Sequence, residues 1–178
     1  GNIASFTATN VTTSPISGTI TVTPTFENGG ESCTGVAETF IITVNPSAQV
    51  TQPSDEVVCH GDKTTYVNFT TTNTEGSTVY SWTNDLTSIG LAASGTGDIP
   101  AFNINCSGNS PDTATIEVTP EYTYDGHTCT GSPETFSLVA NPEAQVNQPS
   151  NQTICNGEST VLINFTSINT GGTTTYTW

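Results

Sequence analysis

Apolar and polar residues alternate along several short stretches of this chain. The longest stretch has apolar residues at every second position, with mostly polar residues between them: Ile116, Val118, Pro120, Tyr122 and Tyr124. Shorter stretches of the same kind are Val67 with Phe69, Tyr80 with Trp82, and Phe136 with Leu138. A period of two is typical of a strand with one buried face. Turn-forming residues at 73–76, 95–97 and 125–126 separate these stretches. We therefore predict an all-β protein with six or seven short strands in about 96 residues.

The chain contains an internal repeat with a constant offset. Residues 1–82 align without a gap with residues 97–178, and 37 of the 82 aligned positions are identical. Matched landmarks are Pro24 with Pro120, Cys33 with Cys129, Phe40 with Phe136, Cys59 with Cys155, and Trp82 with Trp178. The period is therefore 96 residues, the size of a complete small domain, whereas solenoid repeats run about 20 to 50 residues. We expect separate modules joined head to tail.

Two Asn-Pro sequences mark the predicted boundaries between modules, at residues 45–46 and 141–142. Proline cannot donate to a strand ladder and keeps the preceding residue extended, and each pair follows a strand-like run. The predicted organisation is the C-terminal half of one module over residues 1–45, a complete module over 46–141 and the N-terminal half of the next over 142–178. On this division the sequence is an excerpt from a longer array.

A tryptophan near the middle of six or seven strands is typical of an immunoglobulin-like β-sandwich. Trp82 would then lie on the third strand and pack against the facing sheet. The aromatic residues expected in module cores are Trp82, Trp178, Phe40, Phe136, Phe69 and Phe165. Aromatic side chains can also form a sugar-stacking platform, but Tyr80 and Trp82 share one face of a strand, which favours a core.

The chain is strongly acidic. Sixteen Asp and Glu residues face one basic residue, Lys63, and the formal net charge is −15. Such a chain repels nucleic acids and anionic membranes, and no apolar run reaches the roughly 20 residues that cross a bilayer. We expect no nucleic-acid partner and no membrane insertion. The charge is interpreted as a means of solubility and mutual repulsion.

Divalent cation binding is the alternative explanation of this acidity. Asp55, Glu56 and Asp62 lie near the first turn of the complete module and are candidate calcium ligands, because calcium prefers oxygen donors. Their spacing matches no known calcium loop. We therefore predict no metal ion and no other cofactor, with calcium as the alternative.

The sequence shows no catalytic machinery. His60 and His127 are the only histidines, and Asn156 and Glu31 occupy the equivalent positions of the other copies. A catalytic site would not vanish between copies of one array, so both histidines are interpreted as residues of exposed turns. No phosphate-binding loop, zinc-spaced cysteine pair or nucleophile elbow is present. We expect no catalytic residues and no enzymatic activity.

Five cysteines indicate an oxidising, extracellular setting. Cys106 is predicted to be unpaired, because Asn10 occupies its place in the other copy. The other four fall into two classes. The first class precedes a glycine turn and the second follows a hairpin turn; they are Cys59 and Cys155, and Cys33 and Cys129, respectively.

Several disulfide pairings remain open. Cys59 could bond to Cys129 within one module, or Cys33 to Cys59 and Cys129 to Cys155 between neighbours, or each class could pair with cysteines beyond the sequence. In a sandwich the two classes lie at opposite ends of a module, about 30 Å apart. This placement favours a bond between a first-class cysteine of one module and a second-class cysteine of the next. Pairing within one module of a different topology and fully reduced thiols are the alternatives.

A set of recurring short sequences resembles one known family. These are Ile-Cys-Asn-Gly at 154–157, Asn-Phe-Thr at 164–166, Tyr-Thr-Trp at 176–178, Ile-Gly-Leu-Ala-Ala-Ser-Gly-Thr-Gly at 89–97, Val-Thr-Pro at 22–24 and Cys-Thr-Gly at 33–35. Over its whole length, the chain is similar to the PKD-like repeats of giant surface adhesins in gliding Bacteroidetes, the SprB type.

The resemblance implies a function and a location. It implies a filament exported by the type IX secretion route, attached to the outer membrane and displayed on the cell surface, where it serves adhesion and gliding motility. Asp112-Thr113-Ala114 is similar to the O-glycosylation signal of these bacteria, which makes Thr113 a candidate modification site on a loop after Pro111.

We expect the modules to act as a stalk or spacer whose partners are neighbouring modules of the same chain. One alternative is that the modules bind surface polysaccharide directly. The other is that they are accessory domains of a secreted enzyme.

Overall fold

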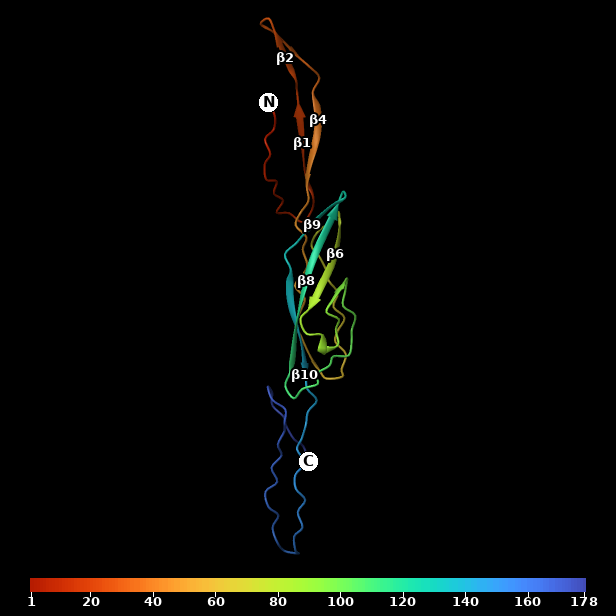
Figure 1. The fold of residues 1–178 in the computed structure, drawn as a ribbon, viewed down its shortest axis with the longest axis vertical. Coiled ribbons are helices and arrows are strands. Elements are labelled where there is room, and N and C mark those ends of the chain that lie inside the picture. The colour runs from red at the N-terminus through yellow and green to blue at the C-terminus, as the bar shows by residue number, and fades with distance from the viewer. The chain divides into compact units, whose positions relative to one another are not determined.

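The computed structural model describes residues 1–178 and consists of strands and loops with a single turn of 3-10 helix (Figure 1). The strands are β1 (Ile16–Val22), β2 (Thr25–Asn28), β3 (Glu31–Thr34), β4 (Glu38–Val44), β5 (Glu56–Cys59), β6 (Ser77–Asn84), β7 (Ser94–Thr96), β8 (Asp112–Tyr124), β9 (His127–Thr130) and β10 (Glu134–Asn141), with helix η1 at Thr87–Ile89. The all-β class predicted from the alternating pattern is confirmed. No helix is long and apolar enough to cross a membrane.

The chain divides into two compact units. The first comprises residues 1–51, 70–80 and 119–133, and the second comprises residues 52–69, 81–118 and 134–178. β4 ends at Val44, directly before Asn45-Pro46. β10 ends at Asn141, the first residue of Asn141-Pro142. The module boundaries at residues 45–46 and 141–142 stay a prediction.

A six-stranded sheet is built entirely from residues 46–141. Its strand order is β5-β10-β8-β6-β7, and β9 pairs with β8. β10 pairs with β8 antiparallel and with β5 parallel. The long central strand β8 explains the alternating pattern: Ala114, Ile116, Val118, Pro120 and Tyr122 are buried, and the residues between them are more exposed. One face of β8 is therefore the centre of the hydrophobic core.

Two further extended segments contact this sheet. Residues 61–69 and 98–104 are joined by two isolated bridges, Lys63 with Asn103 and Val67 with Ile99. The ring of Phe69 meets the ring of Phe136 of β10 edge to face, with centroids 6.5 Å apart. Val67 and Phe69 were predicted to form a strand; they are extended, but their pairing is limited to bridges. This pair closes the core over the sheet.

Two predicted turns have different outcomes. Asp125 and Gly126 connect β8 to β9 with φ of 48° and 75°, the left-handed conformation that a tight hairpin turn requires. The predicted turn at 95–97 is instead largely strand β7, because residues 94–96 pair with β6 opposite Trp82. A Cβ at Gly95 would lie 2.2 Å from the Trp82 ring, so only glycine permits this approach.

Residues 1–45 repeat the strand pairings of residues 97–141. Ile20 pairs with Phe40 in the β1–β4 ladder, as Ile116 pairs with Phe136 in the β8–β10 ladder. The β2–β3 hairpin pairs Phe26 with Cys33, as the β8–β9 hairpin pairs Tyr122 with Cys129. All four partners shift together by 96 positions. The local sequence therefore specifies the same register in both copies.

Residues 142–178 contain no strand but repeat the hydrogen bonds of residues 46–82. The Asn169 carboxamide oxygen accepts from the Gln145 N–H at 2.6 Å, as that of Asn73 accepts from Gln49 at 2.8 Å. The amide nitrogens of the same asparagines donate to the carbonyls of Glu143 and Ser47. The backbone N–H of residue 147 donates to the carbonyl of residue 166, as residue 51 donates to residue 70.

Three aromatic residues predicted to lie in module cores are exposed. Trp178, Phe165 and Phe40 are 100%, 37% and 45% exposed, whereas their counterparts Trp82, Phe69 and Phe136 are 7%, 5% and 3% exposed. The core prediction is thus right for the second set and wrong for the first. The reason is physical: Phe69 and Phe136 pack against each other edge to face, whereas Phe165 packs on Tyr176 and on the fully exposed Trp178, which leaves it partly exposed.

Candidate functional site

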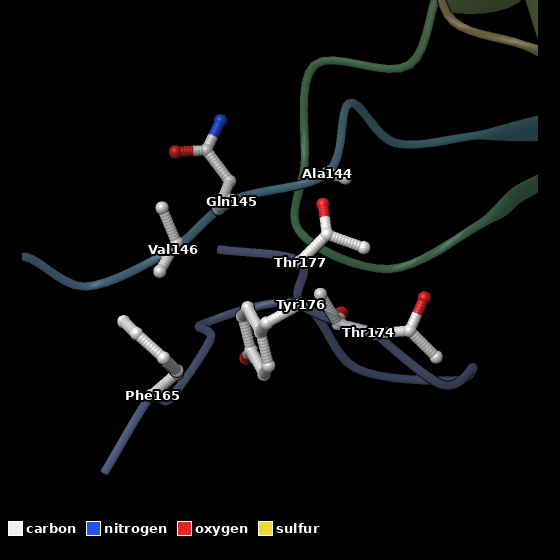
Figure 2. A pocket seen from close by; sticks show the side chains of 8 residues that line it. Ala144, Gln145, Val146, Phe165, Thr174, Tyr176 and Thr177 are labelled. Atoms are coloured by element: carbon white, nitrogen blue, oxygen red, sulfur yellow. The ribbon is translucent and has the colours of Figure 1, made fainter. Parts of the chain in front are cut away.

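A cavity of about 310 Å³ lies in residues 142–178 (Figure 2). One extended segment contributes Ala144, Gln145 and Val146 to the lining, and a second contributes Thr174 and Tyr176. Phe165, which lies between them in the sequence, completes it. The Phe165 and Tyr176 rings lie 5.6 Å apart at 31°, and Phe165 also stacks on Trp178 at 6.2 Å. The cavity is therefore floored by an aromatic cluster.

The chemistry of this cavity matches what a sugar-binding site uses. Aromatic faces stack on the apolar face of a sugar ring, and amide and hydroxyl groups exchange hydrogen bonds with its hydroxyls. Gln145 and Thr174 supply those polar groups here. By composition alone, this is the best candidate for a ligand site in the chain.

The equivalent residues of the complete module argue against that interpretation. Phe165 corresponds to Phe69 and Ala144 corresponds to Ala48, and both counterparts are buried. The cavity is thus lined in part by residues whose counterparts in residues 46–141 are buried, so this part of its lining corresponds to core positions of the other copy. Sequence reasoning did not identify Gln145, Val146 or Thr174 as lining residues, but the 96-residue offset to a buried core was the signal available.

Two further cavities lie beside the Asn-Pro sequences, and each contains one cysteine class. One, of about 290 Å³, is lined by Cys59, Asn141 and Pro142 among others. The other, of about 260 Å³, includes Asn45 and Cys129. Cys59 therefore lies close to Asn141-Pro142, and Cys129 lies close to Asn45. The placement of the two cysteine classes at opposite ends of a module stays a prediction.

All five cysteines are free thiols in the structure. Cys106, the one without a counterpart, is buried, and its sulfur donates to the Ser110 carbonyl at 3.2 Å. In the other copy the Asn10 carboxamide donates to the Ser14 carbonyl at 2.8 Å. Cys106 thus serves as a hydrogen-bond donor in the place of an asparagine. The disulfide pairings stay a prediction.

Two of the three candidate calcium ligands, Asp55 and Glu56, accept hydrogen bonds from neighbouring protein groups. Asp55 accepts from the Ser137 N–H at 2.6 Å, and this bond holds the pKa of the Asp55 carboxyl below its usual value. Glu56 accepts from the backbone and the hydroxyl of Thr65 at 2.8 and 3.2 Å. No group of three or more His, Cys, Asp or Glu residues is placed to hold a metal ion.

The histidines and the candidate glycosylation site occupy different settings. Nδ1 of His60 accepts from the Cys106 N–H at 3.0 Å, and the His60 N–H donates to the Asn141 carbonyl at 2.8 Å. His127 begins β9 at the hairpin turn. Thr113 lies in strand β8 opposite Val139 and not on a loop, although its side chain is exposed.

Asp98 and Tyr66 form a polar pair that sequence reasoning did not identify. The Tyr66 hydroxyl donates to Asp98 at 2.6 Å, and the Phe69 N–H donates to its other oxygen at 2.9 Å. These bonds lower the pKa of Asp98, and the bond to Asp98 raises the pKa of Tyr66. Tyr66 is exposed and Asp98 is partly buried. The pair fixes the segment that carries Phe69, so we interpret its role as structural.

Comparison of the chain with protein-family models, with curated proteins and with solved structures found no match in any of the three.

Proposed function

We propose that this chain is part of a non-catalytic spacer, a tandem array of PKD-like, immunoglobulin-like sandwich modules. The array would form the stalk of a secreted adhesin on the cell surface and hold its adhesive region away from the cell during attachment and gliding. The resemblance of the recurring sequences to giant surface adhesins supplies the biological setting. The structural support comes from how consecutive modules meet.

One hydrogen bond at the module junction carries the proposal, because it occurs twice. The Thr74 N–H donates to the Thr13 carbonyl at 2.9 Å, and the Thr170 N–H donates to the Asn109 carbonyl at 2.7 Å. Both donors and both acceptors are 96 residues apart. Each bond joins the front half of one module to the back half of the preceding one. A joint that repeats between folded modules limits bending, which is what a spacer needs.

The charge distribution also suits a spacer. The net charge is −15, and only one basic residue is present in 178. Like-charged stalks repel one another over about a Debye length, roughly 8 Å at physiological salt. The same charge opposes pairing of edge strands between neighbouring filaments.

Small-angle scattering of arrays with increasing numbers of modules would test the spacer. If the joints are stiff, the maximum dimension should rise by the same increment with each added module. A flexible chain would instead grow roughly as the square root of module number, and that result would contradict the proposal. In cells, deletion of modules should reduce attachment while an array of equal length and unrelated sequence restores it.

Direct binding of polysaccharide is the second candidate function, favoured by the aromatic cavity of residues 142–178. A glycan array probed with the 178-residue chain would separate the two. Binding that is lost in Tyr176→Ala and kept in Val36→Ala, an exposed apolar residue outside the cavity, would favour the second candidate. The spacer proposal expects no glycan binding by the 178-residue chain or by either variant.

A further inference from the structure

We propose that residues 52–60 and 135–141 form a mechanical clamp that carries tension along the chain. Bearing load is a function beyond holding an adhesive region at a distance. The inference deepens the spacer proposed above and takes from it only the source of the tension. Its basis is the direction in which β5 and β10 run beside each other.

β5 and β10 are the first and the last strand of the six-stranded sheet along the chain, and they are neighbours in it. They pair in parallel, with Glu56 opposite Leu138 and Cys59 opposite Asn141. The chain therefore enters this pair at the Glu56 end and leaves it at the Asn141 end. Tension along the chain pulls the two strands past each other, parallel to their own length.

A strand pair that is loaded in this direction resists as a unit. The pull acts across every interstrand hydrogen bond of the ladder, so the bonds share the load and must break together. The antiparallel β1–β4 pair is the contrast within the same chain. Ile16 lies opposite Val44, so tension enters and leaves this pair at one end and opens it one residue pair after another.

Two side chains extend the clamp ahead of β5. Nε2 of Gln52 donates to the Thr135 carbonyl at 2.5 Å, and the Asp55 carboxylate accepts from the Ser137 N–H at 2.6 Å. Both partners lie in the segment of β10 that precedes the ladder or in the residues at its start. The partners advance in the same direction along both segments, so these bonds are loaded together with the ladder.

The far end of the clamp is held by the backbone and by a dry face. The His60 N–H donates to the Asn141 carbonyl at 2.8 Å. On the inner face of the pair, Leu138 and Ala140 are buried and Val58 is half-buried. Hydrogen bonds beside a face that excludes water are electrostatically stronger than the same bonds in water. The ladder is therefore protected on one side.

Asp85 supplies a matched bond outside the clamp. Its carboxylate accepts from the Thr115 N–H of β8 at 2.7 Å, and Asp85 is exposed, as Asp55 is. The two bonds are of the same kind. The bond of Asp85, however, joins β8 to the residue that follows β6, and neither of these is the first or the last strand of the sheet. Its loss should reduce stability without weakening the clamp.

Constant-tension measurements on single molecules test the clamp. The 178-residue chain is held by handles ligated to its two termini under reducing conditions, and the lifetime of residues 46–141 is read from their extension step. That step should be roughly 300 Å, because an extended residue spans about 3.6 Å. A smaller step from residues 16–44 should come first and at lower tension, since β1–β4 opens from one end.

Moving one handle changes the direction of loading in the same fold. With the first handle on Ser110→p-azidophenylalanine, an exposed position, tension enters β8 beside Asp112, which lies opposite Ala140 in the antiparallel β8–β10 pair. The pair then opens from one end, with a step of roughly 100 Å. The lifetime at equal tension should fall by at least about tenfold, because each charge-free or charge-assisted bond that no longer breaks with the others lowers the barrier.

Two variants separate the clamp from general stability. With handles at the termini, Asp55→Ala should shorten the lifetime about tenfold, the effect of one charge-assisted hydrogen bond on a barrier. Asp85→Ala should leave the lifetime under tension unchanged. Urea unfolding without tension should show cooperative transitions with similar midpoints for both variants, which excludes misfolding of either one as the cause.

Three results would overturn the clamp. The first is an equal lifetime with the handle at residue 110 and at the N-terminus. The second is an equal effect of Asp55→Ala and Asp85→Ala under tension, and the third is opening of residues 16–44 and 46–141 at the same tension. Failure of the spacer gives a different result, because growth of the maximum dimension with module number is measured by scattering without tension. An array that is stiff in scattering but opens easily under tension would contradict the clamp alone.

Discussion

Residues 46–141 and the two ends of the chain contain closely related residues in opposite environments. Ile116 and Val118 are fully buried in β8, while Val22 of β1, the counterpart of Val118, is about half exposed. The strand registers are nevertheless the same in both copies. Short-range sequence therefore determines which strands pair, whereas burial depends on contacts with more distant parts of the fold. Hydrogen-bonded pairing and core formation are separable in this chain.

Replacement of the two tryptophans should break the comparison most strongly. Trp82→Ala empties a buried aromatic site and should lower the free energy of unfolding of residues 46–141 by about 3 to 5 kcal/mol. Trp178→Ala removes a fully exposed side chain and should leave that transition unchanged when the chain is monomeric. Urea denaturation followed by far-ultraviolet circular dichroism measures both, since the strand signal does not depend on which tryptophan is kept. Equal effects in the two variants would contradict the comparison.

The paired glycines 76 and 172 should show a smaller contrast. A Cβ at Gly76 would lie 2.4 Å from the Tyr122 ring and 2.6 Å from the Thr123 carbonyl oxygen, whereas a Cβ at Gly172 meets nothing within 4 Å. Gly76→Ala should therefore reduce stability by about 1 to 3 kcal/mol, as overpacking does. Gly172→Ala should have no such effect. Thermal unfolding followed by circular dichroism provides the measurement.

The smallest expected difference between residues 46–141 and the two ends of the chain is in the loss of stability at acid pH. Asp98 has a folded-state pKa below the ordinary value of 3.8 because it accepts bonds from Tyr66 and Phe69. Its contribution is therefore present above pH 3.8 and is lost as the pH falls through the lower folded-state value. Asp98→Asn, which copies Asn2, should flatten the decline in urea midpoint below about pH 4. Asp98 is only partly buried, so the change should be small. A decline that is equally steep in the variant would assign the acid sensitivity elsewhere.

The elements that neighbouring residues specify could be predicted from the sequence. Alternation over residues 116–124 correctly identified the buried face of β8, and Asp125-Gly126 correctly identified a tight turn. The strand at residues 94–96 and the strand position of Thr113 were not predicted. Both depend on pairing with distant strands, β6 and β10, which leaves no signal in the neighbouring residues.

The candidate site was harder to predict than the fold. The sequence around an aromatic residue at a core position can be identical whether or not the side chains that would cover the ring are present. Phe165 and Phe69 lie in identical Asn-Phe-Thr segments, yet one lines a cavity and the other is buried. The offset between copies identifies the shared position, and only the structure shows which copy is open.

The repeated junction bond joins main-chain atoms on both sides, from the N–H of Thr74 or Thr170 to the carbonyl of Thr13 or Asn109. The acceptor side chain differs between the two junctions, and the bond persists. Consequently, a gene that gains or loses one copy by unequal recombination would keep every joint, and mutations that alter the surface side chains at a junction need no compensating change in the adjacent unit.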